Sequence, residues 1–297
     1  VPTIPGIDGV TDVHQVTAWM KKEHVTYPIM IKAAAGGGGK GMVKVERDGD
    51  LQQALDRARS EARKSFGDDT VLAEKYIERG RHIEVQIVAD TQGNVVHLYE
   101  RECTLQRRNQ KIIEEAPSPS IDDDLRNEIC FSATRLMREI GYTTAGTVEY
   151  IFDSAARKFY FLEVNARLQV EHPVTEMVTG IDLVKTQIEI AAGNPLPFSQ
   201  DDIQPQGHSL ECRIYAEDPD NDFMPSPGKI VHLQTPAGGL GVRDDSGIYE
   251  GYTVPLEYDP LLSKLITWGK TRQEAIKRML RALSEYQIYG IKTTIPF

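Results

Sequence analysis

The sequence has 297 residues, of which 40% are hydrophobic and 26% are charged, and its formal net charge at pH 7 is −10. This composition is typical of a globular protein with a sizeable core. The acidic balance argues against a broad basic face that binds nucleic acid or an anionic membrane, but it leaves room for a local basic pocket. No apolar stretch approaches the roughly 18 residues of a membrane span, and no secretory signal is visible.

The three cysteines, Cys103, Cys130 and Cys212, are widely spaced and odd in number. Their spacing predicts neither a disulfide framework nor a metal site, so a reducing compartment fits best. The chain opens at Val1, without a methionine, in turn-like sequence that contains two prolines and two glycines within ten residues. We therefore expect a further segment upstream.

The first predicted unit, residues 1–76, is a strand hairpin followed by a helix and another strand. Apolar residues predict one strand over 27–34 and its partner over 41–48, joined by a glycine-rich loop. Apolar residues at helical spacing predict a helix over 48–69 that ends at a glycine. A further strand is predicted over 70–77.

The middle of the chain is predicted to alternate hairpins with helices. Apolar residues at every second position predict strands over 81–90 and 94–104. A helix with an acidic first turn follows over 121–142, and a second hairpin covers 144–153 and 158–167.

A helix over 175–195 is predicted next, with a bend at Gly180. From about residue 205 the pattern turns to strands and turns, and it ends with a helix over 271–288. The fold class is therefore α+β, with antiparallel hairpins dominating. The predicted units are 1–76, 77–204 and 205–297.

A glycine run, Gly36–Gly39 followed by Lys40 and Gly41, suggests a phosphate site. It is not a P-loop, because a P-loop has Ser or Thr after its lysine and leads into a helix, whereas this run continues with Gly41 into a strand. A dinucleotide-binding loop also needs a following helix. Two interpretations remain: a flexible linker, or a glycine flap whose amides close over a triphosphate, with Lys32 meeting the phosphates.

Two carboxylates, Glu149 and Glu163, lie in strands that a short connection joins. If the strands pair with that turn, the carboxylates can face each other, and two such groups repel unless a cation lies between them. Mg²⁺ is a natural occupant because it prefers oxygen ligands. The alternative is a pair of exposed acidic residues, but the apolar neighbours of each favour a buried, functional pair.

The stretch "NARLQVEHP", residues 165–173, follows directly and leads into a helix. Arg167 can bind a planar carboxylate or carbonate with two hydrogen bonds, and Glu171 is a candidate general base. The alternative is a polar surface loop without a chemical role.

Taken together, several stretches resemble the biotin carboxylase component of biotin-dependent carboxylases, which is an ATP-grasp enzyme. They are "KAAAGGGGKGM", "EKYIERGRHIEVQI", "QRRNQKIIEEAPSPS", "FLEVNARLQVEHPVTE" and "ECRIYAEDP". The resemblance runs through essentially the whole chain, and "QRRNQK" with "NARLQVEHPVTE" is its most specific part. It implies an ATP-grasp fold with a small glycine-flap subdomain and a larger antiparallel-sheet C-terminal subdomain.

The resemblance also implies an activity, that of an ATP-dependent ligase forming a C–N bond. The family carboxylates biotin on a biotin carboxyl carrier protein, using ATP with Mg²⁺ or Mn²⁺ and bicarbonate. Bicarbonate attacks the γ-phosphate to give carboxyphosphate, which yields CO₂ for the biotin enolate.

The family's functional residues carry over by position. The implied ATP-binding residues are Lys32, Gly38, Gly39, Met42, Glu74, Lys75, Tyr76, Ile77, His82 and Gln106. The implied metal ligands are Glu149, Glu163 and Asn165. Lys111, Arg167, Gln169 and the backbone of Val170 are implied to bind bicarbonate. Glu171 is implied to take the bicarbonate proton, and Arg213 is implied to stabilise the biotin enolate.

Some features depart from the family pattern. Asn109 stands where many members have histidine, so a titratable ring is missing there. The chain begins after the family's N-terminal subdomain and ends early, and we expect ATP binding and turnover to need the missing part.

The implied partners are a biotin carboxyl carrier protein or domain, a carboxyltransferase, and a second copy in a homodimer of the full-length protein; no nucleic acid or membrane partner is expected. The implied location is the cytoplasm, or the mitochondrial matrix in a eukaryote. The final acceptor stays open among acetyl-CoA, propionyl-CoA, methylcrotonyl-CoA, pyruvate and urea, with "QRRNQK" and "CRIYAEDP" favouring an acyl-CoA carboxylase, for example in fatty acid biosynthesis.

Two other functions remain as alternatives. One is a nucleotide-binding or assembly module without catalysis, which need not retain all six of Lys32, Glu149, Glu163, Arg167, Glu171 and Arg213. The other is a different carboxyphosphate-forming ATP-grasp ligase, which biotin-dependent ATP turnover would distinguish.

Overall fold

The computed structural model describes residues 1–35 and 41–297, which form two compact units. Unit 1 comprises residues 1–81 and 150–163, and unit 2 comprises residues 82–149 and 164–297. The division predicted from the sequence, into 1–76, 77–204 and 205–297, stays a prediction.

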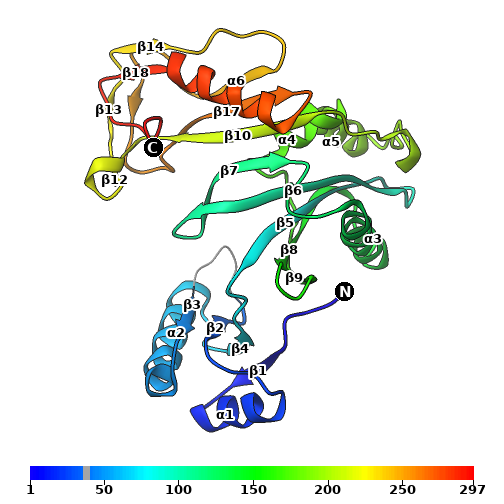
Figure 1. Cartoon of the computed structure of the whole chain (residues 1–297), viewed down its shortest axis with the longest axis vertical. Helices are drawn as coiled ribbons and strands as arrows, with labels where there is room; N and C mark the ends of the chain where they lie inside the picture. Colours follow the sequence, from blue (N-terminus) through cyan, green and yellow to red (C-terminus); the bar gives the residue numbers. More distant parts are fainter. Residues whose placement is uncertain (36–40) are drawn as a thin grey trace. The chain divides into compact units, whose positions relative to one another are not determined.

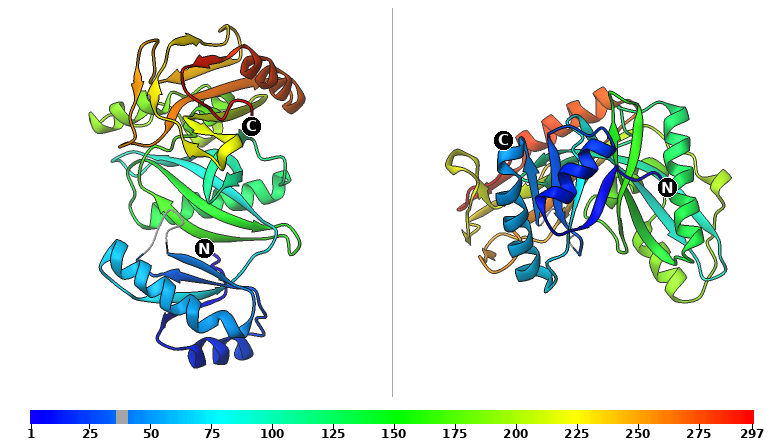
Figure 2. Two further views of the ribbon diagram at one scale, coloured as in Figure 1. Left: turned by 90° about the vertical axis from the view of Figure 1, so that its left-hand side faces the viewer. Right: turned by 90° about the horizontal axis from the view of Figure 1, so that it is seen from below.

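Unit 1 is built on a four-stranded antiparallel sheet in the order β1-β4-β2-β3, with two helices on one face (Figure 2). Its elements are β1 (Gly6–Val10), α1 (Val13–Lys22), β2 (Ile29–Ala33), β3 (Met42–Val45), the 3₁₀ turn η1 (Asp48–Asp50), α2 (Leu51–Phe66) and β4 (Val71–Lys75). The predicted hairpin, helix and third strand are all present. The opening residues, interpreted as turn-like, instead contain β1, which pairs with β4.

The core of unit 1 lies between the helices and the sheet. Ile29 and Ile31 point to one face of β2, two residues apart, and are fully buried. They pack in one cluster with Leu55 and Ala58 of α2 and Val16 of α1. The apolar stripe of α2 therefore holds the hairpin in place.

Unit 2 is built on an antiparallel sheet, and the whole eight-stranded order is β15-β17-β10-β7-β6-β5-β8-β9 (Figure 1). The strands of this sheet are β5 (Gly80–Ala89), β6 (Val95–Arg107), β7 (Gln110–Ala116), β8 (Thr144–Asp153), β9 (Lys158–Asn165), β10 (His208–Tyr215), β15 (Val242–Ser246) and β17 (Leu261–Gly269). Most of β9 and the end of β8 fall within residues 150–163, which belong to unit 1. Such a sheet, together with the helices, confirms the predicted fold class.

The helices of unit 2 cover different parts of the sheet. They are α3 (Asp123–Glu139), α4 (His172–Thr179), α5 (Leu183–Ala191) and α6 (Arg272–Glu285). Alternate residues of β10 face opposite sides. Leu210 and Ile214 pack with α6, whereas α4 packs with Ile266, which lies opposite Glu211. The α4 face of the sheet therefore carries the odd-numbered residues of β10.

The bent helix predicted over 175–195 is wrong in its continuity. The structure has two helices, α4 and α5, and α4 ends at Gly180, whose φ of 73° is left-handed. Glycine adopts this conformation readily, and it ends the hydrogen-bonded helix instead of bending it.

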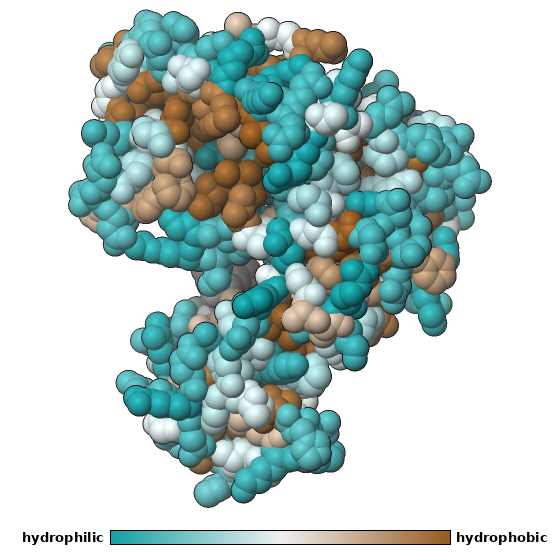
Figure 3. All heavy atoms as spheres, viewed as in Figure 1, coloured by the Kyte–Doolittle hydropathy of each residue, from teal (hydrophilic) through white to brown (hydrophobic). Residues whose placement is uncertain are grey.

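Short elements complete unit 2: η2 (Gln200–Asp202), β11 (Glu217–Asp218), η3 (Pro219–Asn221), β12 (Met224–Pro225), β13 (Gly228–Lys229), β14 (His232–Gln234), β16 (Thr253–Val254) and β18 (Gln287–Tyr289). Figure 3 shows apolar surface near β13 and β14, a segment where Val231 is 62% exposed. Among the described residues, no helix is long and apolar enough to cross a membrane.

Candidate active site

The face of the sheet that α4 covers carries charged residues with no access to solvent. Glu84 of β5, Arg101 of β6 and Glu114 of β7 are each 0% exposed. A charge in such a place is costly unless a partner neutralises it. The partners of these residues define the site.

Arg101 lies directly opposite Glu84, and its Nε donates to Glu84 Oε1 at 2.6 Å. Its Nη1 donates to Gln86 Oε1 at 2.7 Å and to Thr175 Oγ1 at 3.0 Å. Its Nη2 donates to Thr147 Oγ1 at 3.2 Å. Because Thr175 belongs to α4, this guanidinium fastens α4 to three strands of the sheet.

Lys111 of β7 binds three carboxylates. Its Nζ donates to Glu149 Oε1 at 2.9 Å, to Glu171 Oε1 at 2.6 Å, and to Glu84. Strand alternation alone would place Lys111 and Glu114, three residues apart, on opposite faces. The pairing of β6 with β7 shifts register between Lys111 and Ile113, and such an irregularity redirects a side chain. Burial would raise the pKa of Glu84, but Lys111 and Arg101 hold it well below its usual range.

Glu171 is the residue just before α4, and it is fully buried. Its Oε1 accepts from Lys111, and its Oε2 accepts from Arg213 Nη2 at 2.9 Å. Arg213 Nε also donates to Glu114 Oε1 at 2.6 Å. The carboxylate of Glu171 is therefore held between two cations, in one orientation.

Glu149 is buried, and the side chains of Lys111, His82 and Asn165 surround its carboxylate. His82 Nε2 lies 3.0 Å from its Oε2, and Asn165 Nδ2 donates to its Oε1 at 3.0 Å. Burial disfavours the charged imidazole of His82, but the bonds to Glu149 and Glu84 raise its pKa to about 9. Gln106 Nε2 lies 3.3 Å from the other ring nitrogen.

The loop before α4 combines an exposed residue with fixed ones. Arg167 is exposed, and its Nη1 donates to Gln169 Oε1 at 3.2 Å. Gln169 is 5% exposed, and among the described residues its Nε2 has no acceptor. The carbonyl of Val170 accepts from Lys264 Nζ at 3.0 Å. The unpaired amide is a donor that a small anion could use.

Of the residues predicted to bind ATP, six of those that the structure describes lie in unit 1. Lys32 is paired with Met42 across the hairpin, and its ammonium binds Glu74. Lys44 lies 4.6 Å from the ring centre of Tyr76. Lys75, the last residue of β4, is exposed, and Ile77 is buried. Gly38 and Gly39 lie outside the described residues.

The predicted metal ligands belong to both units. Glu149 and Asn165 are in unit 2, and the structure brings them into contact, whereas Glu163 is in unit 1. The atoms that His82 and Glu84 could offer lie within 4.8 Å of those of Glu149. Carboxylate and amide oxygens suit a hard cation such as Mg²⁺ or Mn²⁺, so the donor set fits the expected ion. The role of Glu163 stays a prediction.

Sequence reasoning missed several charged residues of the site. They are Glu84, Arg101, Glu114, Glu211 and Lys264. Each lies within a strand, but only Glu84 and Glu211 stand directly between two apolar residues, a signal that could have found these two. Their importance follows from burial under α4, which the local pattern does not contain.

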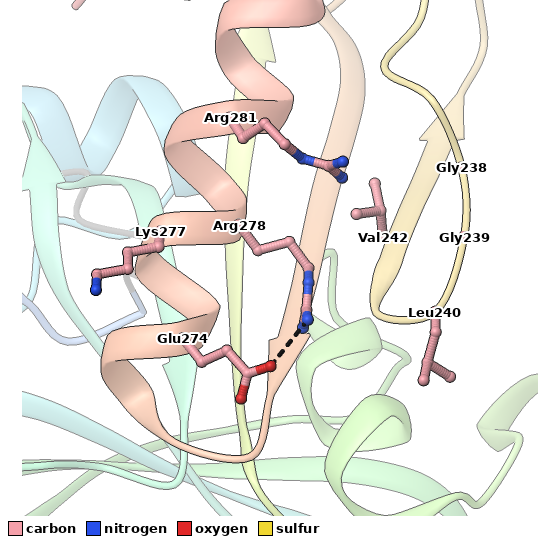
Figure 4. A pocket seen from close by; sticks show the side chains of 8 residues that line it. All are labelled: Gly238, Gly239, Leu240, Val242, Glu274, Lys277, Arg278 and Arg281. Atoms are coloured by element: carbon pink, nitrogen blue, oxygen red, sulfur yellow. Dashed lines mark hydrogen bonds and ion pairs between the residues drawn. The ribbon is translucent and has the colours of Figure 1, made fainter.

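Another pocket of about 470 Å³ lies between α6 and the loop that leads into β15 (Figure 4). Arg278 projects into it and donates to Glu274 at 3.0 Å, while Lys277 points away. None of the residues predicted for catalysis lines this pocket.

Comparison with known proteins covers nearly the whole chain. The family described as carbamoyl-phosphate synthase L chain, ATP binding domain, matches residues 1–199, and the biotin carboxylase C-terminal domain matches residues 211–297. The chain belongs to the biotin carboxylase family. The resemblance inferred from "NARLQVEHPVTE" and the other stretches is thereby confirmed.

Relatives in the biotin carboxylase family are similar over the full length of this chain. A pyruvate carboxylase subunit from Methanothermobacter thermautotrophicus is 54% identical, and biotin carboxylase of Haemophilus influenzae is 51% identical; each alignment covers 100% of this chain. This chain spans 60% and 65% of the length of those two relatives.

The solved structures include a biotin carboxylase domain with the same fold. The dimer of this domain from Hydrogenobacter thermophilus 2-oxoglutarate carboxylase matches with a TM-score of 0.94 and 47% identity. The match covers 100% of this chain and 65% of that one. That structure is a complex with MgADP, ADP and bicarbonate.

Proposed function

We propose that this chain carries out the ATP- and bicarbonate-dependent carboxylation of biotin on a carrier protein, through carboxyphosphate. The observation that carries the proposal is Glu171, a fully buried carboxylate held between Lys111 and Arg213. A base and two cations fixed at one point suit a reaction that removes a proton and develops negative charge. The complex of the Hydrogenobacter domain with MgADP and bicarbonate supports the same substrates.

The residues have separate roles in this proposal. Glu171 accepts the proton of bicarbonate on a carboxylate oxygen, and the bicarbonate oxygen so freed attacks the γ-phosphorus while ADP leaves. Lys111, Arg167, Gln169 and the backbone of Val170 hold the bicarbonate. Arg213 then faces the oxygen of the biotin enolate, where a fixed cation stabilises the charge that develops. Carboxyphosphate hydrolyses readily, so water must be excluded.

We propose that ATP binds through the residues that the resemblance implies, among them Lys32, the segment Glu74–Ile77, His82 and Gln106. Mg²⁺ or Mn²⁺, with Glu149, Glu163 and Asn165 as ligands, neutralises charge on the phosphates. This assignment rests on the resemblance and on the contact between Glu149 and Asn165.

The proposed partners are a biotin carboxyl carrier protein, a carboxyltransferase, and a second copy of the full-length protein. The dimer formed by the Hydrogenobacter domain supports the last. We place the protein in the cytoplasm or the mitochondrial matrix, and the three free cysteines support a reducing compartment. We propose an acyl-CoA or pyruvate as the final acceptor, and the relatives named as pyruvate carboxylase and methylcrotonoyl-CoA carboxylase subunits support this choice.

The first test measures ADP release by the protein at its full natural length. We expect release to require bicarbonate and to rise with free biotin, because the carboxyl group passes from bicarbonate to biotin. A rate that ignores biotin would contradict the proposal and favour another carboxyphosphate-forming ligase. No turnover with intact ATP binding would favour the module without catalysis.

The second test replaces the proposed base. Glu171→Gln should abolish carboxylation while ATP affinity stays near that of the wild type, because the amide keeps the shape but cannot take a proton. The readouts are biotin carboxylation and nucleotide binding by calorimetry. Loss of ATP binding would show that Glu171 has a structural role instead.

A further inference from the structure

Glu211 is a buried carboxyl group that the proposed mechanism does not use. It lies in the middle of β10, opposite Glu114 of β7 and Ile266 of β17, on the face that α4 covers. It is 0% exposed, and within the described part of the chain neither of its oxygens has a hydrogen-bond partner. An ionised carboxylate in that position would be strongly destabilising.

Glu114, its cross-strand neighbour, is also 0% exposed. Its Oε1 accepts from Arg213 Nε at 2.6 Å, whereas its Oε2 has no donor among the residues that the structure describes. Side chains directly opposite each other on neighbouring strands have Cβ atoms about 5 Å apart. Two carboxyl groups at that separation do not both ionise without a cation between them.

In the part of the chain that the structure describes, no cation forms an ion pair with Glu211. Arg213, two residues along the same strand, donates to Glu114 and Glu171. Lys264 of β17 donates to the Val170 carbonyl and lies 3.5 Å from Asp245.

Among the described residues, further titratable groups near this layer are Glu171, Arg243 of β15 and, on α4, His172 and Glu176. His172 Nδ1 lies 2.8 Å from the Gln169 carbonyl, and Glu176 is paired with Arg243 at 2.6 Å. Each of these groups is bound to a partner other than Glu211. A proton is therefore the simplest way to neutralise the Glu211 carboxylate.

We propose that Glu211 is a neutral carboxylic acid that donates its proton to Oε2 of Glu114, and that it acts as a positioning residue for Arg213. The pair then carries one negative charge, which matches the single guanidinium that Glu114 binds. Held from both sides, Glu114 fixes the direction of Arg213, whose other end reaches Glu171. The role in catalysis rests on the proposed function, whereas the shared proton does not.

The titration behaviour of the two groups agrees with this geometry. Burial raises the pKa of Glu211 well above its usual range, and Glu114 adds to the effect. Burial also raises the pKa of Glu114 to about 7, although Arg213 opposes the rise.

Infrared spectroscopy tests the proton without any activity. At neutral pH, the difference spectrum between the full-length wild type and Glu211→Gln should show loss of one protonated carboxylic acid C=O band. Glu217→Gln is the matched control, because Glu217 is also buried but is ion-paired with Arg107. It should leave the acid band in place. A difference spectrum for Glu211→Gln that shows only a lost carboxylate band would overturn the proposal.

Kinetics test the positioning role. Glu211→Leu removes the donor to Glu114, and we expect kcat for biotin carboxylation to fall roughly tenfold or more with ATP affinity unchanged. Glu211→Gln restores a neutral donor of the same shape, so it should recover most of that loss. Equal impairment of the Gln and Leu variants would overturn the role. If the wild type shows no biotin-dependent turnover, the proposed function is wrong, and the infrared result still decides the shared proton.

Discussion

At the scale of single residues, the hydrogen bond from Lys264 Nζ to the Val170 carbonyl orients the backbone where bicarbonate is predicted to bind. We expect Lys264→Met to raise the KM for bicarbonate roughly tenfold, because a hydrogen bond from a charged donor contributes about 1.5 kcal/mol or more. Steady-state kinetics with bicarbonate and ATP varied separately would measure this.

The KM for ATP should not change in Lys264→Met, since the carbonyl that Lys264 binds belongs to the loop before α4. Lys277→Met is the control, because Lys277 is an exposed lysine of α6 that points away from the pocket in Figure 4. Equal increases in both KM values would mean that Lys264 supports the fold of unit 2 and not the loop.

The Glu211–Glu114 pair predicts how stability changes with pH. Unfolded glutamates release their protons near 4.5, whereas the folded pair retains one proton above that pH. The folded state then binds more protons than the unfolded state, so the free energy of unfolding falls as pH rises, by up to about 1.4 kcal/mol per unit. Glu211→Gln should therefore gain stability relative to the wild type between about pH 5 and pH 7.

Urea unfolding at a series of pH values measures this difference. Glu217→Gln, which loses an ion pair with Arg107 instead, should show no such gain. If the wild type and Glu211→Gln keep a constant difference across the range, the pair does not retain a proton.

The sequence identified some residues of the site and not others, for a physical reason. Glu149 could be singled out because apolar residues flank it in its strand. Glu171 could be singled out because it lies in a stretch dense in polar residues. Glu84 and Arg101 occupy alternate strand positions, which a sequence pattern cannot distinguish from solvent-facing ones. Only the packing of α4 buries that face.

At the scale of elements, local signals sufficed where the periodicity was strong. The hairpin of β2 and β3 and the helices α2, α3 and α6 lie where alternation and helical spacing predict them. β1 was missed because its glycines conceal a strand whose pairing with β4 is long-range. β7 was also missed, although it carries Lys111 and Glu114.

The attachment of α4 to the sheet depends on Arg101. Arg101→Met should lower the free energy of unfolding by about 3 kcal/mol, because it leaves Glu84 Oε1 buried without its donor and releases Thr175. Thr175→Val is the matched variant that removes only the hydroxyl, and we expect a loss of about 1 kcal/mol. Urea unfolding compares the two, and equal losses would contradict a dominant role for the ion pair.

At the scale of the whole molecule, the chain crosses between its two units at residues 81–82, 149–150 and 163–164. Residues 150–163 return to unit 1, so unit 1 is not one continuous segment of the chain. The predicted ATP-binding residues are correspondingly divided between the units. Fold class and family could be predicted because they rest on long motifs, whereas the roles of single residues await the variants above.

The burial of all three cysteines, Cys103, Cys130 and Cys212, has a practical consequence. Burial raises the pKa of each thiol, that of Cys212 to about 12, so thiolate is scarce in the native state. All three belong to unit 2. A thiol reagent should therefore label the protein only when unit 2 opens. The labelling rate then measures how often unit 2 opens.

Arg101→Met should increase the rate of cysteine labelling, and mass spectrometry can count the labels over time. Labelling of the native wild type as fast as that of the urea-unfolded chain would show that the thiols are accessible without opening. The three cysteines of this chain thus report local unfolding of unit 2, and no residue needs to be introduced for the measurement.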